Sequence, residues 1–287
     1  MGKLTVSVSR LDFLERSQNP DGAWGYAPGR QTWLEPTCYA LLALYPRQGR
    51  VFARGWDRMR GAQLPSGAWP AAPGMPEGHW VTALAITLHA TAGVWDEVFQ
   101  RGVAWLLATT GGERGILVRA AHFLRPSLVE FDSRYSGWPW QPGTSSWVEP
   151  TAHTLTALRS ASGHIHDPRL GARILTGERM LLDRRCRDGG WNYGNKRILG
   201  VELPSYPEST ALALIALAGN PGLDGPAAAA LAERQWQATR SRLARAWLTL
   251  CLRRLGSRTD VLSPLATGET DVMATALEAL GSAAVLA

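Results

Sequence analysis

The chain has 287 residues, 45% hydrophobic and 19% charged, a composition that supports a sizeable core and excludes a disordered or collagen-like chain. Its formal net charge of +6 is concentrated in the arginine-rich stretch 231–258, and because no zinc-finger spacing or RNA-binding aromatic motif accompanies it, we expect no nucleic-acid partner. No apolar run approaches the roughly 18 residues of a membrane-spanning helix and no secretory signal is evident, so we expect a cytoplasmic protein and leave open a peripheral contact with a membrane.

In chain order, the first predicted elements are an amphipathic helix and an apolar one. Residues 11–26 predict a helix that runs into a turn with Gly22 and Trp24, and residues 35–44 (EPTCYALLAL) predict a helix that is apolar on nearly every face. Such a helix is buried on all sides. The pair Glu35-Pro36 predicts an acidic helix cap followed by proline at the first helical position.

The same pair of elements recurs along the chain. Apolar segments like 35–44 start at residues 79, 149, 208, 241 and 271, and Gly-Trp turns precede the copies at Trp69, Trp138 and Trp191. Glu149-Pro150 repeats the Glu-Pro pattern. Since six hairpins with apolar inner helices would leave apolar faces exposed in an open array, we predict an all-α fold, an α6/α6 toroid around a central cavity. We assign residues 1–287 to a single toroid domain with an insertion at about 112–135.

Two of the turns carry a longer motif. The segments Gln18-Asn-Pro-Asp-Gly22-Ala-Trp24 and Gln63-Leu-Pro-Ser-Gly67-Ala-Trp69 resemble the QW motif of squalene–hopene and oxidosqualene cyclases, whose toroid is related to that of protein prenyltransferases. The resemblance covers residues 8–280. It implies that Gln and Trp tie neighbouring outer helices together, and that the central cavity holds an isoprenoid or similar apolar molecule without a cofactor.

The chain departs from the catalytic motifs of these families. The cyclases carry DxDD at the start of an inner helix; here the proton-donating middle Asp aligns with Glu35, Glu149 and Glu208, and the other aspartates are replaced. Protein prenyltransferases hold zinc through a late His, but no His follows His166. We therefore expect no metal site and exclude a zinc prenyltransferase.

The candidate site is the ring of residues that begins the inner helices. In a toroid, Glu35, His79, Glu149, Glu208 and Asp271 lie near one rim of the cavity, with Tyr39 and His153 one turn further in. Carboxyl groups that face one another in an apolar cavity raise one another's pKa and so become general acids. We expect Trp33, Trp80 and Trp147 to line the cavity mouth, where their π faces stabilise a carbocation or stack on a sugar.

Three functions are compatible with this pattern. The leading one is binding of an isoprenoid, with acid-initiated cyclisation by a terpene cyclase-like isomerase or lyase in which Glu35 or Glu149 donates the proton. The second is a carbohydrate-active toroid with paired carboxylates and Trp platforms. The third is a non-catalytic binding or scaffolding toroid, favoured if side chains such as Trp247, Met273 and Leu277 fill the central cavity. The acids at the helix starts then have only a structural role, because an acid near a helix N-terminus stabilises the helix through its dipole.

Overall fold

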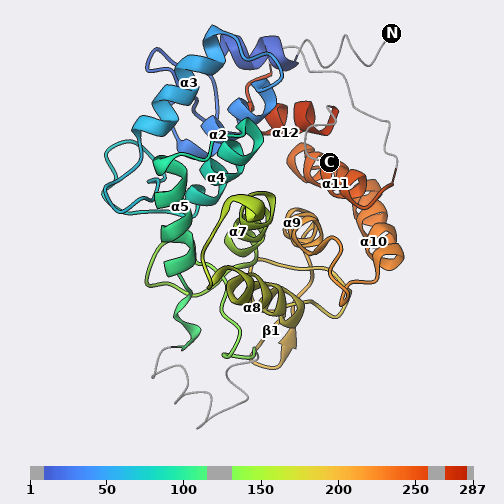
Figure 1. Ribbon diagram of the computed structural model, residues 1–287. Coiled ribbons are helices and arrows are strands. Elements are labelled where there is room, and N and C mark those ends of the chain that lie inside the picture. Colours follow the sequence, from blue (N-terminus) through green and yellow to red (C-terminus); the bar gives the residue numbers. More distant parts are fainter. Residues whose placement is uncertain (1–9, 115–130, 258–268, 283–287) are drawn as a thin grey trace.

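A computed structural model describes residues 10–114, 131–257 and 269–282. Six inner helices follow one another around a ring, and the last packs against the first (Figure 1). They are α2 (Leu34–Leu44), α4 (Val81–Ala92), α7 (Val148–Ser160), α9 (Pro207–Leu217), α11 (Arg242–Arg254) and α12 (Val272–Ser282). The predicted all-α toroid is confirmed.

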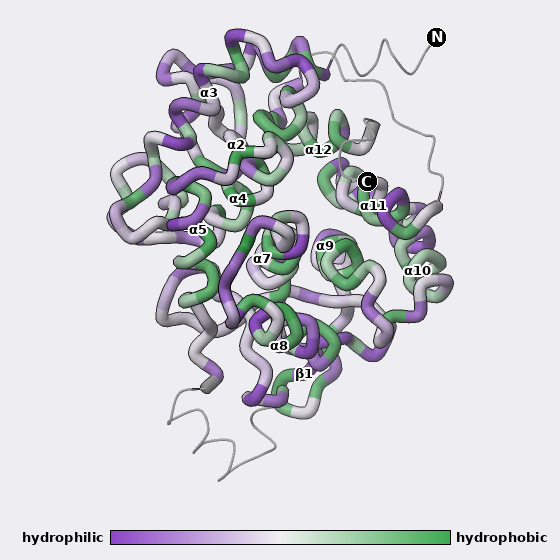
Figure 2. The backbone as a smooth tube through the Cα atoms, viewed as in Figure 1, coloured by the Kyte–Doolittle hydropathy of each residue, from purple (hydrophilic) through white to green (hydrophobic). Residues whose placement is uncertain are grey.

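A second layer of helices surrounds the ring. It comprises residues 10–16, α3 (Arg50–Gly61), α5 (Glu97–Ala108), α8 (Leu170–Asp183) and α10 (Gly225–Ala238). Helix α3 packs on α2, α5 on α4 and α8 on α7, while α10 lies against both α9 and α11. Figure 2 shows inner helices such as α4 and α9 as mostly hydrophobic, whereas hydrophilic residues are frequent along α3.

Short elements complete the described residues: the 3₁₀ turns η1 (Gly112–Arg114) and η3 (Ser162–His164), and a hairpin of β1 (Arg197–Ile198) and β2 (Val201–Glu202). Most of the predicted insertion at 112–135 lies outside the described residues. The assignment of residues 1–287 to a single domain stays a prediction.

Four buried tryptophans hold the outer helices to the inner ones. Each indole N–H donates to a carbonyl near the end of the preceding outer helix, and each backbone N–H donates to a threonine of the following inner helix. The Trp, carbonyl and Thr sets are Trp24, Leu14 and Thr37; Trp69, Met59 and Thr82; Trp138, Leu106 and Thr151; and Trp191, Leu181 and Thr210. Because a buried polar group without a partner is costly, this repeated pairing defines how each hairpin packs.

The two glutamines of the longer motif connect one outer helix to the next. Gln18 Nε2 donates to the Val51 carbonyl in the first turn of α3 at 2.8 Å, and Gln63 Nε2 donates to the Val98 carbonyl in the first turn of α5 at 2.7 Å. Carbonyls in the first turn have helical partners further along, so each glutamine adds a second hydrogen bond there. These are ties of the kind that the resemblance implies.

Backbone hydrogen bonds also run around the rim where the inner helices begin. The first N–H of one inner helix, or that of the residue before it, donates to a carbonyl in the Gly-Trp turn of a neighbouring hairpin. The pairs are Leu34 to Ala71, Trp80 to Trp140, Val148 to Tyr193 and Val272 to Tyr26. The last of these closes the ring, because it joins α12 to the turn that precedes α2.

An ion-pair cluster reinforces the same closure. The buried Arg10 donates from Nε to Glu278 at 2.7 Å, and Arg242 donates to the same carboxylate at 2.7 Å. Burial alone would raise the pKa of Glu278, but the hydrogen bonds from Arg242 and Arg10 lower it below its ordinary value. The first and last helices of the described chain are therefore joined by a charged, largely buried contact.

Candidate active site

The three repeated glutamates occupy the second helical position, not the cap. Helices α2, α7 and α9 begin one residue before Glu35, Glu149 and Glu208, and their N-caps are Trp33, Trp147 and Tyr206, which make no side-chain capping hydrogen bond. The expectation that Glu35 and Glu149 cap their helices was wrong. The residue before each helix is extended because its backbone N–H donates to the carbonyl of the buried Trp in the preceding turn.

Two other rim residues are caps. Asp271 accepts a hydrogen bond from the Ala274 N–H at 2.8 Å, and Ser241 accepts one from the Ala244 N–H at 3.2 Å. Asp271 is exposed. Its position is explained by helix capping alone, and it does not join the glutamate cluster.

Glu35, Glu149 and Glu208 lie close enough to influence one another across the ring. Burial, followed by the charges of Glu35 and Glu208, raises the pKa of Glu149 to about 8. Burial also raises the pKa of Glu35, although the hydrogen bond from the Tyr26 hydroxyl, 2.5 Å from Oε2, acts in the opposite direction. At neutral pH the Glu149 carboxyl is therefore mostly protonated, which is the state a general acid requires.

An aromatic layer, formed by Tyr39, Trp80, His153 and Trp247, fills the ring below the glutamates. The Tyr39 hydroxyl is 3.2 Å from His153 Nε2, Trp80 stacks on His153 with centroids 5.0 Å apart, and Trp247 packs edge-on against both Tyr39 and His153. Burial lowers the pKa of His153 to about 3, so its ring is neutral. Trp80 belongs to this layer and not to the cavity mouth where we expected it.

A cavity of about 450 Å³ lies on the other side of the aromatic layer. Tyr39, His153 and Trp247 form its inner end, and its walls are mostly aliphatic: Leu42, Leu84, Leu212, Leu250, Leu277 and Leu280. Neither the three clustered glutamates nor Asp271 lines it. Trp247 fills part of the ring as a member of the aromatic layer, and Trp247 and Leu277 also line the cavity that remains beyond that layer.

The rim above the glutamates is rich in exposed aromatic rings. Tyr26 is 43% exposed, Trp147 36%, Tyr193 55% and Tyr206 39%. Trp33 is half-buried and packs 6.0 Å from Tyr26. His79, at the start of α4, is also half-buried, and burial lowers its pKa to about 4.

Sequence reasoning missed Tyr26, Trp140 and Tyr193. Each stands two residues after the buried Trp of its turn, in Trp24-Gly-Tyr26, Trp138-Pro-Trp140 and Trp191-Asn-Tyr193. The Tyr26 hydroxyl donates a hydrogen bond to Glu35, Trp140 packs edge-on against Trp80, and the ring of Tyr193 lies tilted against that of Tyr206 with centroids 4.9 Å apart. This repeated aromatic position was the signal that could have found them.

The described part of the chain brings no three His, Cys, Asp or Glu side chains into a group that could hold a metal ion. Within the same residues, no helix has the length and apolar character needed to cross a membrane.

No family model and no curated protein matches the chain. Solved structures do resemble it. The endo-β-1,4-glucanase CMCax from Acetobacter xylinum is 12% identical, with 96% of each chain covered and a TM-score of 0.61. The type II terpene cyclase MstE from Scytonema is 19% identical, with 88% of this chain and 73% of that chain covered and a TM-score of 0.55.

A second structure of that cyclase holds geranylgeranyl dihydroxybenzoate, its substrate. The cyclase chain in that structure is 17% identical to this one, with 98% of this chain and 78% of that chain covered and a TM-score of 0.56. At these identities the likeness concerns the fold alone. The class that fold and comparisons define is the α/α toroid, which is shared by terpene cyclases and by enzymes that act on polysaccharides.

Proposed function

We propose that the chain binds an isoprenoid or a similar apolar molecule at the rim of its helical ring, against the glutamate cluster, and cyclises it by protonation, with Glu149 as the proton donor. The central cavity that the sequence led us to expect as the site is not lined by Glu149. The observation that carries this proposal is the cluster of Glu149 with Glu35 and Glu208. A carboxyl group that is buried beside two others keeps its proton at neutral pH. It can then deliver that proton to a weak base such as an alkene.

The proposed reaction needs only an acid and a base. The Glu149 O–H bond breaks and its proton forms a new C–H bond with the π electrons of a substrate alkene, leaving a carbocation on the neighbouring carbon. A second alkene of the same chain attacks that cation and closes a ring. Loss of a proton to solvent water from a carbon beside the final cation forms a new alkene, so the product is an isomer of the substrate. Glu149 is finally reprotonated from solvent, which balances the proton released.

Aromatic side chains supply the electrostatic support that such cations need. Trp33 and Trp147 stand directly before the first turns that carry Glu35 and Glu149, and Tyr39 lies one turn further in. The face of an aromatic ring attracts a cation by about 0.5–2 kcal/mol, more when water is excluded. These three rings are the residues that we assign to shaping and stabilising the cation.

The pKa pattern meets the requirement of this chemistry for one protonated carboxyl group, a requirement that glycoside hydrolysis shares. A glycosidase pairs one protonated carboxyl group with one ionised carboxylate that acts as base or nucleophile. Here the pKa values of both Glu35 and Glu149 are raised. Only the Glu149 proton is needed to start the cyclisation, whereas a glycosidase also needs an ionised carboxylate beside its acid.

The test is incubation of the full chain with farnesyl diphosphate, geranylgeranyl diphosphate and squalene, with products followed by gas chromatography–mass spectrometry and binding by native mass spectrometry. We expect a cyclic isomer of at least one probe, and Glu149→Gln to reduce its formation by about 10²–10⁴-fold while binding persists. Glu97→Gln is the matched control, because Glu97 is an exposed first-turn acid on the outer helix α5. Absence of binding by all three probes, or full activity in Glu149→Gln, would reject the proposal.

A second candidate, a carbohydrate-active toroid, is favoured by the exposed rings of Tyr26, Trp147, Tyr193 and Tyr206 around the same acids. Such rings are suited to stacking on sugars. Soluble β-1,4-glucan and α-glucan oligosaccharides should then release new reducing ends, and Trp147→Ala should raise KM. No release from either substrate would remove this candidate.

A further inference from the structure

The cavity beyond the aromatic layer faces away from the glutamates. Its inner end, at Tyr39, His153 and Trp247, is buried, whereas Thr156, Arg159, Ser160 and Arg254, close to the C-terminal ends of α7 and α11, are half-buried or exposed. The cavity therefore opens on the face where the inner helices end and is closed by the aromatic layer on the side of the acids.

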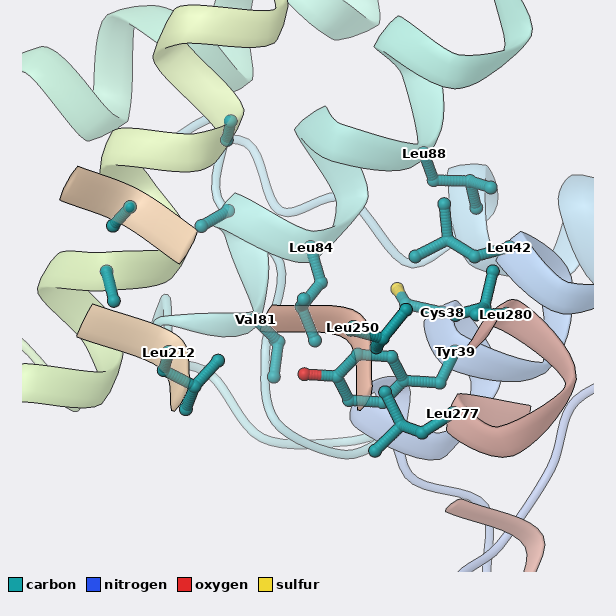
Figure 3. Packing of buried hydrophobic residues seen from close by; sticks show 14 of the residues in the cluster. Cys38, Tyr39, Leu42, Val81, Leu84, Leu88, Leu212, Leu250, Leu277 and Leu280 are labelled. Atoms are coloured by element: carbon teal, nitrogen blue, oxygen red, sulfur yellow. The ribbon is translucent and has the colours of Figure 1, made fainter. Parts of the chain in front are cut away.

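The walls define an apolar slot of limited depth. Leucines from five inner helices (α2, α4, α9, α11 and α12) surround it, as Figure 3 shows for Leu42, Leu84, Leu250, Leu277 and Leu280 around Tyr39. On α7 the slot extends from His153 to Ser160. Seven helical residues rise about 10 Å, the length of an extended tail of about eight carbon atoms.

The mouth of the slot is positively charged. Arg159 and Arg254 line it, and none of the acidic residues that the structure describes does. Arg159 is engaged, because it donates to the Ala216 carbonyl and pairs with Glu178. Arg254 is exposed, and it makes no ion pair or hydrogen bond with any residue of 10–114, 131–257 and 269–282.

We propose that this slot is a second binding site, for an aliphatic chain with an anionic head group, separate from the glutamate cluster. The tail lies among the leucines with its end against Tyr39, and the head group pairs with Arg254 at the mouth. The ligand class follows from the apolar walls, the closed inner end and the cation of Arg254, which has no partner among the described residues. This site does not depend on the proposed cyclisation, since a saturated chain can occupy it without reacting.

The test measures binding of saturated carboxylates with 6 to 16 carbon atoms to the full chain by isothermal titration calorimetry. Each methylene that enters the slot should tighten binding about fourfold, until the tail reaches Tyr39 and further methylenes add little. The alcohol of the same length should bind more weakly and the alkylammonium more weakly still. Equal affinity for carboxylate and alkylammonium, or no dependence on chain length, would overturn the proposal.

Substitutions in the slot test the contributions of the head group and of the tail to binding separately. Arg254→Gln should weaken carboxylate binding about fivefold and leave the alcohol unchanged, whereas its exposed neighbour Arg253, which does not line the slot, gives a control in Arg253→Gln. Ile215→Trp, at a half-buried wall position, should weaken both ligands. If Arg254→Gln and Arg253→Gln change carboxylate affinity equally, the assignment of an anionic head group to Arg254 is wrong.

One further variant distinguishes the slot from the proposed active site. Glu149→Gln should bind saturated carboxylates as the wild type does, because Glu149 lies on the opposite side of the aromatic layer. Loss of this binding in Glu149→Gln would show that the two sites are one. Failure of the cyclisation assay with retained carboxylate binding would reject the proposed function alone.

Discussion

Replacing Glu149 with glutamine should make folding stability much less sensitive to pH. In the unfolded chain the carboxyl titrates near its ordinary value of 4.5, whereas in the folded chain its pKa is about 8. The folded state therefore binds a proton more tightly than the unfolded state. This contribution to stability is complete below pH 4.5 and is lost as the pH rises from 4.5 to about 8.

The size of the effect follows from the shift. One pKa unit corresponds to about 1.4 kcal/mol, and the half-buried carboxyl is partly screened by water, so we expect the free energy of unfolding to fall by about 2–3 kcal/mol between pH 5 and pH 8 through this group. Glutamine has a similar shape and does not titrate. The difference in stability between Glu149→Gln and the wild type should therefore shift by that amount in favour of the variant.

Urea unfolding at pH 5, 6, 7 and 8, followed by circular dichroism, measures the difference directly. Comparing the two proteins at each pH cancels the contributions of His79, His153 and Glu278, whose pKa values are also shifted. Glu97→Gln, with its exposed acid, should follow the wild type at every pH. A stability difference that is constant from pH 5 to pH 8 would refute the idea that Glu149 is protonated because it is buried beside other carboxyl groups.

Two further substitutions test how the ring is held together. Gly55→Ala should destabilise the chain by about 1–3 kcal/mol, because the added Cβ would lie 2.6 Å from the Trp24 ring. Gly61→Ala is the control: it lies on the same helix with open space around it and should be neutral or stabilising by up to about 1 kcal/mol. Equal effects of the two substitutions in thermal unfolding would contradict the packing argument. Arg10→Ala should cost about 3 kcal/mol because it leaves Glu278 with less compensation in a buried site. Arg16→Ala on the exposed face of the same helix should cost less than about 0.5 kcal/mol, and a similar loss in both would show that the Arg10–Glu278 contact adds nothing.

The ring of helices was predictable because its signal is periodic. Each inner helix carries the same small and large apolar residues, and the Trp-to-Thr hydrogen bond recurs with a separation of 13 residues at Trp24, Trp69 and Trp138. At Trp191 the separation is 19 residues, since the hairpin of β1 and β2 lies between the turn and α9. The hairpin packs as the others do, because the Trp191 backbone N–H still donates to the hydroxyl of the threonine in the following inner helix, Thr210.

The arrangement of the site was less predictable. The Glu-Pro pattern indicated a capping acid, but the N-caps are Trp33 and Trp147, two residues earlier, and the glutamates are therefore first-turn residues. The meeting of Tyr39 with His153 was anticipated from their equivalent positions, whereas the separation of the acids from the apolar cavity was not. That separation depends on how Trp80 and Trp247 pack across the ring, which no local pattern specifies.

The ring closure has a kinetic consequence. Arg10 and Glu278 are separated by 268 residues, and the Val272-to-Tyr26 hydrogen bond joins segments almost as distant. Neighbouring hairpins can pack as soon as each is formed. The contact between α12 and α2 requires both ends of the chain to be in place, and contacts between residues distant in sequence form slowly. We therefore expect the final step of folding to be the closing of a nearly complete arc, and until it occurs the faces of α12 and α2 that pack on each other have no partner.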